Sequence, residues 1–115
     1  MIQRIDVGPR MSEAAIHNGV VYLAGQVATG AATDIGGQTR DVLAAIDALL
    51  AKAGTDKSRV LRAQIFLVDM ADFPGMNAVW DQWVVPGHTP ARATVQAALA
   101  KPQWKVEIVV TAAMP

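Results

Sequence analysis

Several short segments of the chain alternate apolar and polar side chains with a period of two, which is the spacing of a β-strand. This pattern predicts strands at residues 2–7, 14–17, 20–26, 60–68, 91–97 and 105–113. Asn18-Gly19 separates the second of these strands from the third. Because a type I′ turn needs a positive φ at both central residues, this dipeptide predicts a tight hairpin between the two strands.

A longer segment, residues 34–53, carries apolar side chains at the spacing of an amphipathic helix. Thr33 or Asp34 can cap its N-terminus through a side-chain oxygen. Gly54 follows the segment, where a left-handed C-cap residue is favoured. The pattern and the caps together predict one long helix between the third and fourth strands.

A second, shorter helix is predicted to begin with Asp72 as its cap, with Pro74 tolerated in the first turn. Pro86-Gly87 is expected to end this helix before the strand at 91–97. The resulting order is β-β-β-α-β-α-β-β, which contains two strand–helix–strand units. Two helices cannot cover both faces of a sheet of about six strands, so we expect both on one face of a mixed α+β sheet.

The fourth and the last predicted strands are apolar on both of their faces. One face carries Val106, Ile108, Val110 and Ala112 of the last strand, with Leu61, Ala63, Ile65 and Leu67 of the fourth. The opposite face carries Phe66, Val68, Val109 and Ala113. Since the helices bury only one face, we expect another copy of the chain to bury the second.

The composition narrows the class of protein further. The 115 residues suffice for a single domain; 52% are hydrophobic, 17% are charged, and ten basic residues balance ten acidic ones. Such a chain is not disordered, and without a basic stripe it is not expected to bind nucleic acid. No apolar run is long enough to span a membrane, and the first ten residues contain no apolar h-region, so we expect no secretory signal. With no cysteine, we expect no disulfide, no metal site and a cytoplasmic protein.

Two polar residues stand out within apolar strands. Arg92 shares one face of its strand with Thr94 and Gln96, and it is interpreted either as a structural ion-pair partner or as an anion-binding group. Glu107 is surrounded by valines in the last strand. It is interpreted either as the structural partner of Arg92 or Lys105, or as a general base that activates water.

Other residue types give weaker indications of chemistry. His17 and His88 lie on different elements and form no metal-binding motif, so both are interpreted as structural or surface residues. Ser12 and Ser58 have no histidine at a spacing that indicates a catalytic triad. The three tryptophans have no spaced basic partners, and we expect them in the core or in subunit contacts.

Four stretches of the sequence, in this order and at this spacing, resemble the YjgF/RidA family of enamine/imine deaminases. They are Tyr22-Leu23-Ala24-Gly25-Gln26-Val27, Asp72-Phe73 through Met76-Asn77, Pro90-Ala91-Arg92-Ala93-Thr94-Val95 and Lys105-Val106-Glu107-Ile108. The resemblance covers residues 1–115 as one domain. Segments around Ser12 and Trp80 are closer to a YoaB-like branch than to the best-known deaminases.

The resemblance implies a fold similar to that of trimeric chorismate mutase, with three sheets packed into a homotrimer and sites in the clefts between subunits. In such a site Arg92 would bind the carboxylate of a 2-imino acid, helped by the backbone N–H of Gly25. Glu107 would position or activate the attacking water, and Asn77 and Phe73 match family positions near the cleft. The implied products are a 2-oxo acid and ammonia, and no cofactor is implied.

The sequence departs from the family pattern at three positions: Met11 replaces a tyrosine, Thr94 a frequent cysteine and Val109 a second glutamate. Ser12 is a candidate for the hydrogen bond that the tyrosine would make. A second hypothesis is therefore a non-catalytic trimer that binds small carboxylates such as 2-oxo acids. RNA cleavage or a chaperone role, attributed to relatives, is disfavoured by the neutral charge.

Overall fold

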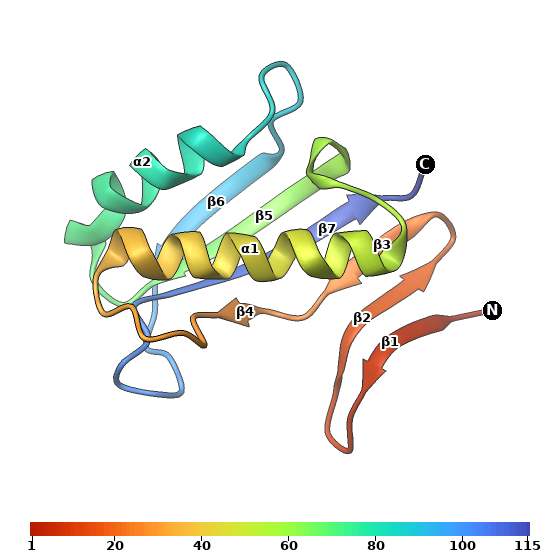
Figure 1. The fold of residues 1–115 in the computed structure, drawn as a ribbon, viewed down its shortest axis with the longest axis horizontal. Helices are drawn as coiled ribbons and strands as arrows, with labels where there is room; N and C mark the ends of the chain where they lie inside the picture. The colour runs from red at the N-terminus through yellow and green to blue at the C-terminus, as the bar shows by residue number, and fades with distance from the viewer.

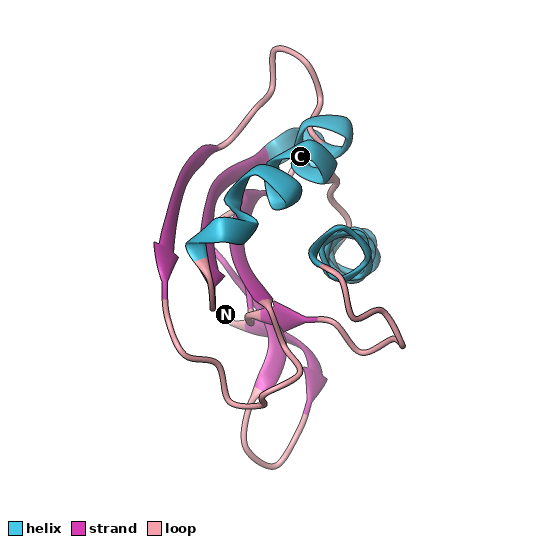
Figure 2. Ribbon diagram, turned by 90° about the vertical axis from the view of Figure 1, so that its left-hand side faces the viewer, coloured by secondary structure: helices cyan, strands magenta, loops and turns pink.

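The computed structural model describes residues 1–115 as a seven-stranded mixed sheet with two α-helices on one of its faces (Figures 1 and 2). The strands are β1 Gln3–Val7, β2 Ser12–His17, β3 Val20–Leu23, β4 Gln26–Val27, β5 Val60–Leu67, β6 Ala91–Gln96 and β7 Val106–Ala113. The helices are α1 Ile35–Ala53 and α2 Phe73–Trp83, and the 3-10 turns are η1 Lys57–Arg59 and η2 Met70–Asp72. The predicted fold class is confirmed, with one short strand, β4, in addition.

The sheet order is β1-β2-β3-β7-β5-β6, and β4 also pairs with β7. Only the β5–β6 pair is parallel, and α2 provides the crossover between these two strands. Strand β7, the last in the sequence, thus lies at the centre of the sheet, between β3 and β4 on one side and β5 on the other (Figure 1).

The hairpin turn and the caps of α1 form as predicted, whereas Asp72 precedes α2 without making a side-chain capping hydrogen bond. Asn18 and Gly19 both have positive φ, 52° and 76°, in the β2–β3 hairpin. The Asp34 carboxylate accepts a hydrogen bond from the Gly37 N–H at 3.1 Å and caps α1. Gly54 ends that helix in the left-handed region, at φ 91°. Neither helix combines the length and the apolar composition needed to cross a bilayer.

The hydrophobic core lies between the two helices and the face of the sheet that they cover. Val106, Ile108, Val110 and Ala112 of β7 are buried there, as the alternation predicts. From α1 and α2 the largest buried contributions come from Ile46, Leu50, Met76, Trp80 and Trp83. The expected core placement of Trp80 and Trp83 is confirmed, whereas Trp104 is only partly buried in the loop before β7.

Two predicted strands are altered by irregular pairing. The strand predicted at 20–26 is interrupted at Ala24-Gly25, because the register against β7 gains one residue between the Tyr22–Thr111 and Gln26–Ile108 pairs. A β-bulge near Val60 likewise shifts the alternation in β5. The assignment of Leu61 to the helix-covered face is therefore wrong: its side chain is 50% exposed, and Val60 is buried instead.

The end predicted for the second helix is also wrong. Helix α2 ends at Trp83, and Val84 is already extended, with φ −64° and ψ 153°. The residue before a proline is disfavoured in the helical region, and Val85 precedes Pro86. This restriction ends the helix three residues before Pro86.

Both helices lie on one side of the sheet (Figure 2), so no helix covers its second face. This face carries several apolar side chains. The strand register places Tyr22, Phe66, Val95 and Val109 on this face, which we call the open face. Phe66 and Val109 are half-buried, whereas Tyr22 is 53% and Val95 is 45% exposed. A row of large apolar side chains in this state is typical of a surface that binds another protein chain.

Candidate functional site

Arg92 is the second residue of the edge strand β6, and its side chain points toward α2. Its Nη1 donates a 2.7 Å hydrogen bond to Oδ1 of Asn77. Its guanidinium carbon lies 5.7 Å from the centre of the Phe73 ring and 5.2 Å from the Trp80 ring. These contacts fix the plane of the guanidinium at the junction of β6 and α2.

The spacing of the three α2 residues explains why they meet one side chain. Phe73, Asn77 and Trp80 follow each other at intervals of four and three residues, so they share one face of the helix. The register pairs Arg92 with Ala63, and Ala63 belongs to the helix-covered face. Helix and strand therefore turn the guanidinium and its three partners toward each other.

No carboxylate neutralises the Arg92 guanidinium. The single ion pair in the chain joins Lys52 to Asp6, at 2.9 Å, at the other end of the sheet. The interpretation of Arg92 as a structural ion-pair partner of Glu107 is therefore wrong, and its other N–H groups remain available. A planar guanidinium with free parallel donors binds a carboxylate through two hydrogen bonds.

Thr94 lies on the same face of β6 as Arg92, two residues further along the strand. Its Oγ1 is buried and has no hydrogen-bond partner in the chain. A buried hydroxyl usually finds a partner, because leaving it without one costs about 1–3 kcal/mol. Thr94 thus offers an unused polar group beside the arginine.

Glu107 forms a separate group with Gly25. The Glu107 side chain packs so closely on Gly25 that a Cβ at that position would collide with the carboxylate; even the carboxyl carbon would lie only 2.9 Å away. The chain interruption between β3 and β4 thus makes room for this carboxylate. Close by, Gln26 Nε2 donates to Glu13 Oε2 at 3.3 Å. Glu107 is partly buried and open to solvent on the second face.

The Arg92 group and the Glu107 group lie on opposite faces of the sheet. Glu107 is paired with Phe66 on the open face, whereas Arg92 is paired with Ala63 on the helix-covered face. Gly25 also lies three strand positions from β6, which is about 14 Å at the usual strand spacing. One chain by itself therefore does not bring Arg92 together with Glu107 or with the Gly25 N–H.

Ser12 is remote from both groups within the chain. It starts β2 and pairs with Val7 in the β1–β2 hairpin. Its strand lies four positions from β6, about 19 Å away at the usual spacing. Met11, which stands where the family has a tyrosine, is 51% exposed beside it. Both residues lie where only a neighbouring chain would bring Arg92 near them.

The sequence pattern places Trp80 in the core or in subunit contacts and does not indicate that it belongs to the Arg92 site. Trp80 lies in the core, where it is 5% exposed, and its ring also stacks on the Arg92 guanidinium. The signal that could have found it is its helical spacing from Phe73 and Asn77. No group of three or more His, Asp or Glu side chains lies close enough together to hold a metal ion.

The arrangement of a mixed sheet with two helices on one face and one exposed apolar face defines a small domain of the chorismate-mutase-like fold. The sequence model described as Endoribonuclease L-PSP matches residues 1–114. The chain therefore belongs to this family, which is the YjgF/RidA family that the sequence resembles.

Individual relatives are similar over nearly their whole length. A RutC family protein of Haemophilus ducreyi is 55% identical over 99% of this chain and 97% of its own. The RutC family protein YoaB of Escherichia coli K12 is 50% identical over 98% of both chains. Among solved structures, NMB1025 of Neisseria meningitidis, a member of the YjgF protein family, is 49% identical. It superposes with a TM-score of 0.98 over 100% of this chain and 96% of its own.

Proposed function

We propose that the chain is a homotrimeric deaminase that hydrolyses 2-imino acids, the tautomers of reactive enamines, to 2-oxo acids and ammonia. The observation that carries this proposal is the Arg92 guanidinium, which is held by Asn77 and two aromatic rings and has no acidic partner. A carboxylate is the anion that best matches its free edge. Every 2-imino acid presents a carboxylate next to its imine carbon.

The separation of the two polar groups supports a site between chains. Glu107 lies on the open face, and the apolar surface around it needs a covering partner. When a second copy packs on this face, the edge that carries Arg92 of one copy can approach Glu107 and Gly25 of another. A cyclic trimer repeats this contact three times and closes.

In such a cleft the residues have distinct roles. Arg92 binds the substrate carboxylate, and the Thr94 hydroxyl, which lacks a partner in the chain, donates a hydrogen bond to the substrate. Glu107 takes a proton from water as the oxygen adds to the imine carbon. Glu107 returns this proton to the nitrogen, which gives a carbinolamine. The hydroxyl proton then passes to the nitrogen as the C=O bond forms and the C–N bond breaks, and ammonia leaves. Positioning and electrostatic stabilisation are sufficient for a substrate this reactive, so no cofactor is required.

The test is the rate of imine hydrolysis, measured on 2-iminobutanoate or 2-iminopropanoate generated in a coupled assay. Arg92→Ala should lower kcat/KM by about 100-fold or more, because it removes the carboxylate anchor. Arg92→Lys keeps the charge but not the fork, and it should recover only part of the rate. Arg59→Ala, at an exposed arginine of η1, is the matched control and should be unchanged. Equal rates for wild type and Arg92→Ala would contradict the mechanism.

A trimeric binding protein for small carboxylates is the second candidate, and Thr94 in the place of a frequent cysteine favours it. This function predicts saturable binding of 2-oxobutanoate that depends on Arg92, with no acceleration of imine hydrolysis. The same protein preparations distinguish the two candidates. RNA cleavage, which the family description mentions, is tested alongside by incubation with single-stranded RNA at physiological salt, and we expect no cleavage at zero net charge.

A further inference from the structure

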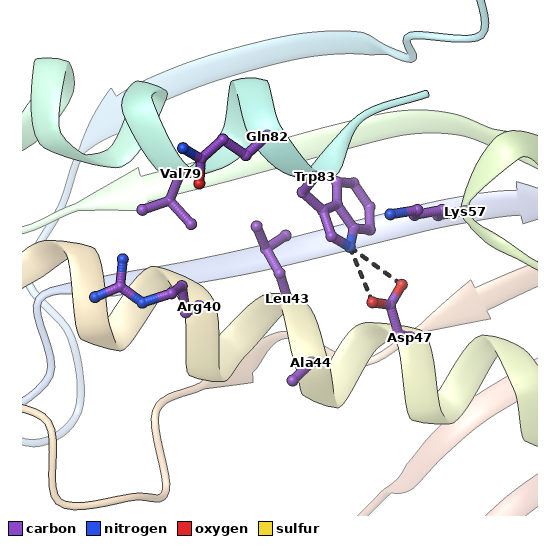
Figure 3. A pocket seen from close by; sticks show the side chains of 8 residues that line it. All are labelled: Arg40, Leu43, Ala44, Asp47, Lys57, Val79, Gln82 and Trp83. Carbon is purple, nitrogen blue, oxygen red and sulfur yellow. Dashed lines mark hydrogen bonds between the residues drawn. The ribbon is translucent and has the colours of Figure 1, made fainter. Parts of the chain in front are cut away.

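A concave site lies between the two helices, on the side of the molecule opposite the open face. It is a groove of about 240 Å³ whose walls are α1, α2 and the turn η1 (Figure 3). Its lining consists of Arg40, Leu43, Ala44, Asp47, Lys57, Val79, Gln82 and Trp83. None of these residues belongs to the Arg92 group or to the open face, so the groove is a separate site from the one proposed above.

Trp83 organises the polar side of the groove. Its indole is buried, and Nε1–H donates to both carboxylate oxygens of Asp47, at 3.1 Å each (Figure 3). On another side of the same ring, Lys57 Nζ lies 5.7 Å from the ring centre. One indole therefore positions an anionic and a cationic side chain from two different elements.

These two charges do not neutralise each other. Asp47 and Lys57 both contact Trp83, yet their charged atoms are more than 4.0 Å apart, and the only ion pair in the chain is elsewhere. Each charged group keeps hydrogen-bonding capacity toward the groove: the carboxylate has further lone pairs, and the ammonium has three N–H donors. Beside them Leu43 and Val79 form a buried apolar floor.

We infer that this groove binds a free α-amino acid with an apolar side chain. The ammonium of such a ligand pairs with Asp47, its carboxylate pairs with Lys57, and its side chain covers Leu43 and Val79. In such a ligand one carbon atom carries both the ammonium and the carboxylate. This arrangement matches Asp47 and Lys57, which both contact the Trp83 ring but form no ion pair with each other. The volume is below the range of about 300–1,000 Å³ that is usual for drug-sized ligands, and it suits a smaller molecule.

The groove is also connected to the Arg92 site by packing. The rings of Trp83 and Trp80 are 5.2 Å apart at their centres, and Trp80 stacks on the Arg92 guanidinium. A ligand that orders Trp83 therefore acts on a side chain whose neighbour contacts the arginine. A ligand bound in the groove can thus change the position of Arg92 through the two adjacent tryptophan rings.

Binding is tested by NMR titration of the protein with L-leucine, following the indole N–H signal of Trp83. We expect a saturable shift with a dissociation constant of roughly millimolar size. Two half-ligands, 3-methylbutylamine and 4-methylpentanoate, each lack one charged group and should bind about tenfold more weakly or worse. Repeating the titration in Arg92→Ala separates the groove from the Arg92 site, because the shift should persist there.

Variants of the two charged residues complete the test. Asp47→Asn keeps an acceptor for the Trp83 N–H, and Lys57→Gln keeps a flexible polar side chain without the charge at a partly exposed position, so both should fold as the wild type does. Each should weaken leucine binding by about tenfold or more, whereas Arg59→Gln, in the same turn as Lys57, should not. The inference is overturned if leucine causes no saturable shift, if the two variants bind as the wild type does, or if only Arg92→Ala abolishes binding.

Discussion

Arg92 on β6 and Glu107 on β7 are both polar side chains within apolar strands, but their surroundings differ. Arg92 is enclosed by residues of its own chain: the hydrogen bond that it donates to Asn77 and two aromatic rings of α2 fix its position. Glu107 rests on the backbone at Gly25 and faces a surface that the chain leaves open. One chain by itself therefore fixes the guanidinium of Arg92 but leaves the carboxylate of Glu107 on an uncovered face. Under the proposed function, a neighbouring chain would enclose that carboxylate.

The largest effect is expected when the open face is given a charge. Phe66→Asp would place one carboxylate per chain in the interface, and burial of an unpaired ion costs on the order of several kcal/mol. We expect a monomer at micromolar concentration in sedimentation velocity, with no imine hydrolysis. Ala51→Asp, on the exposed side of α1, is the control and should stay assembled and active. A fully trimeric Phe66→Asp protein would show that the open face is not the interface.

The next experiment asks directly whether Arg92 and Glu107 act from different chains. Arg92→Ala and Glu107→Gln should each be inactive alone, and co-expression of the two variants should produce mixed trimers. Random assembly places an intact Arg92 opposite an intact Glu107 at about a quarter of the sites, so about a quarter of the wild-type activity should return. Mixed trimers with no more activity than either variant would place both residues of each site in one chain.

The smallest expected effect is on the pH dependence of stability, and it comes from the N-terminal cap of α1 on the helix-covered side. The hydrogen bond from the Gly37 N–H lowers the pKa of Asp34 below its ordinary value of 3.8. A carboxyl group whose pKa is lowered by folding stabilises the protein above its unfolded pKa, and this contribution is lost as the pH falls through the folded pKa. Asp34→Asn keeps an acceptor but does not titrate.

This variant should therefore lose slightly less stability than the wild type when the pH is lowered from neutral to about 3. The measurement is the midpoint of thermal unfolding as a function of pH. Asp81→Asn, at an exposed aspartate of α2, is the matched control and should follow the wild-type curve. Identical pH dependence of Asp34→Asn and wild type would show that the cap does not contribute to acid stability.

Most of the fold was predictable because its signals are local. The Asn18-Gly19 turn and the Asp34 and Gly54 caps each depend on a few adjacent residues, and all of them lie where the pattern indicates. The errors fall where pairing with a distant strand decides. The bulge that exposes Leu61 and the interruption at Gly25 depend on the register against β7, and that register does not follow from the spacing within either segment.

The same reason explains what was predictable about the site. Arg92 was recognised as unusual from its own strand, and its contacts with Phe73 and Asn77 agree with the positions that the family resemblance implies. That Arg92 and Glu107 lie on opposite faces of the sheet follows only from the register of β6 with β5 and of β5 with β7. Alternation within one strand does not say which of its side chains share a face with those of a neighbouring strand. The groove at Trp83 had no sequence signal, since Asp47 and Lys57 belong to different elements.

The contact between Glu107 and Gly25 has a consequence for the genetics of this protein. Gly25 does not have a positive φ, so its own backbone conformation would accept alanine. The obstacle is the neighbouring carboxylate, which occupies the space that a methyl group would need. A harmful Gly25→Ala change should accordingly be suppressed, for assembly though not for catalysis, by shortening residue 107 in the same gene.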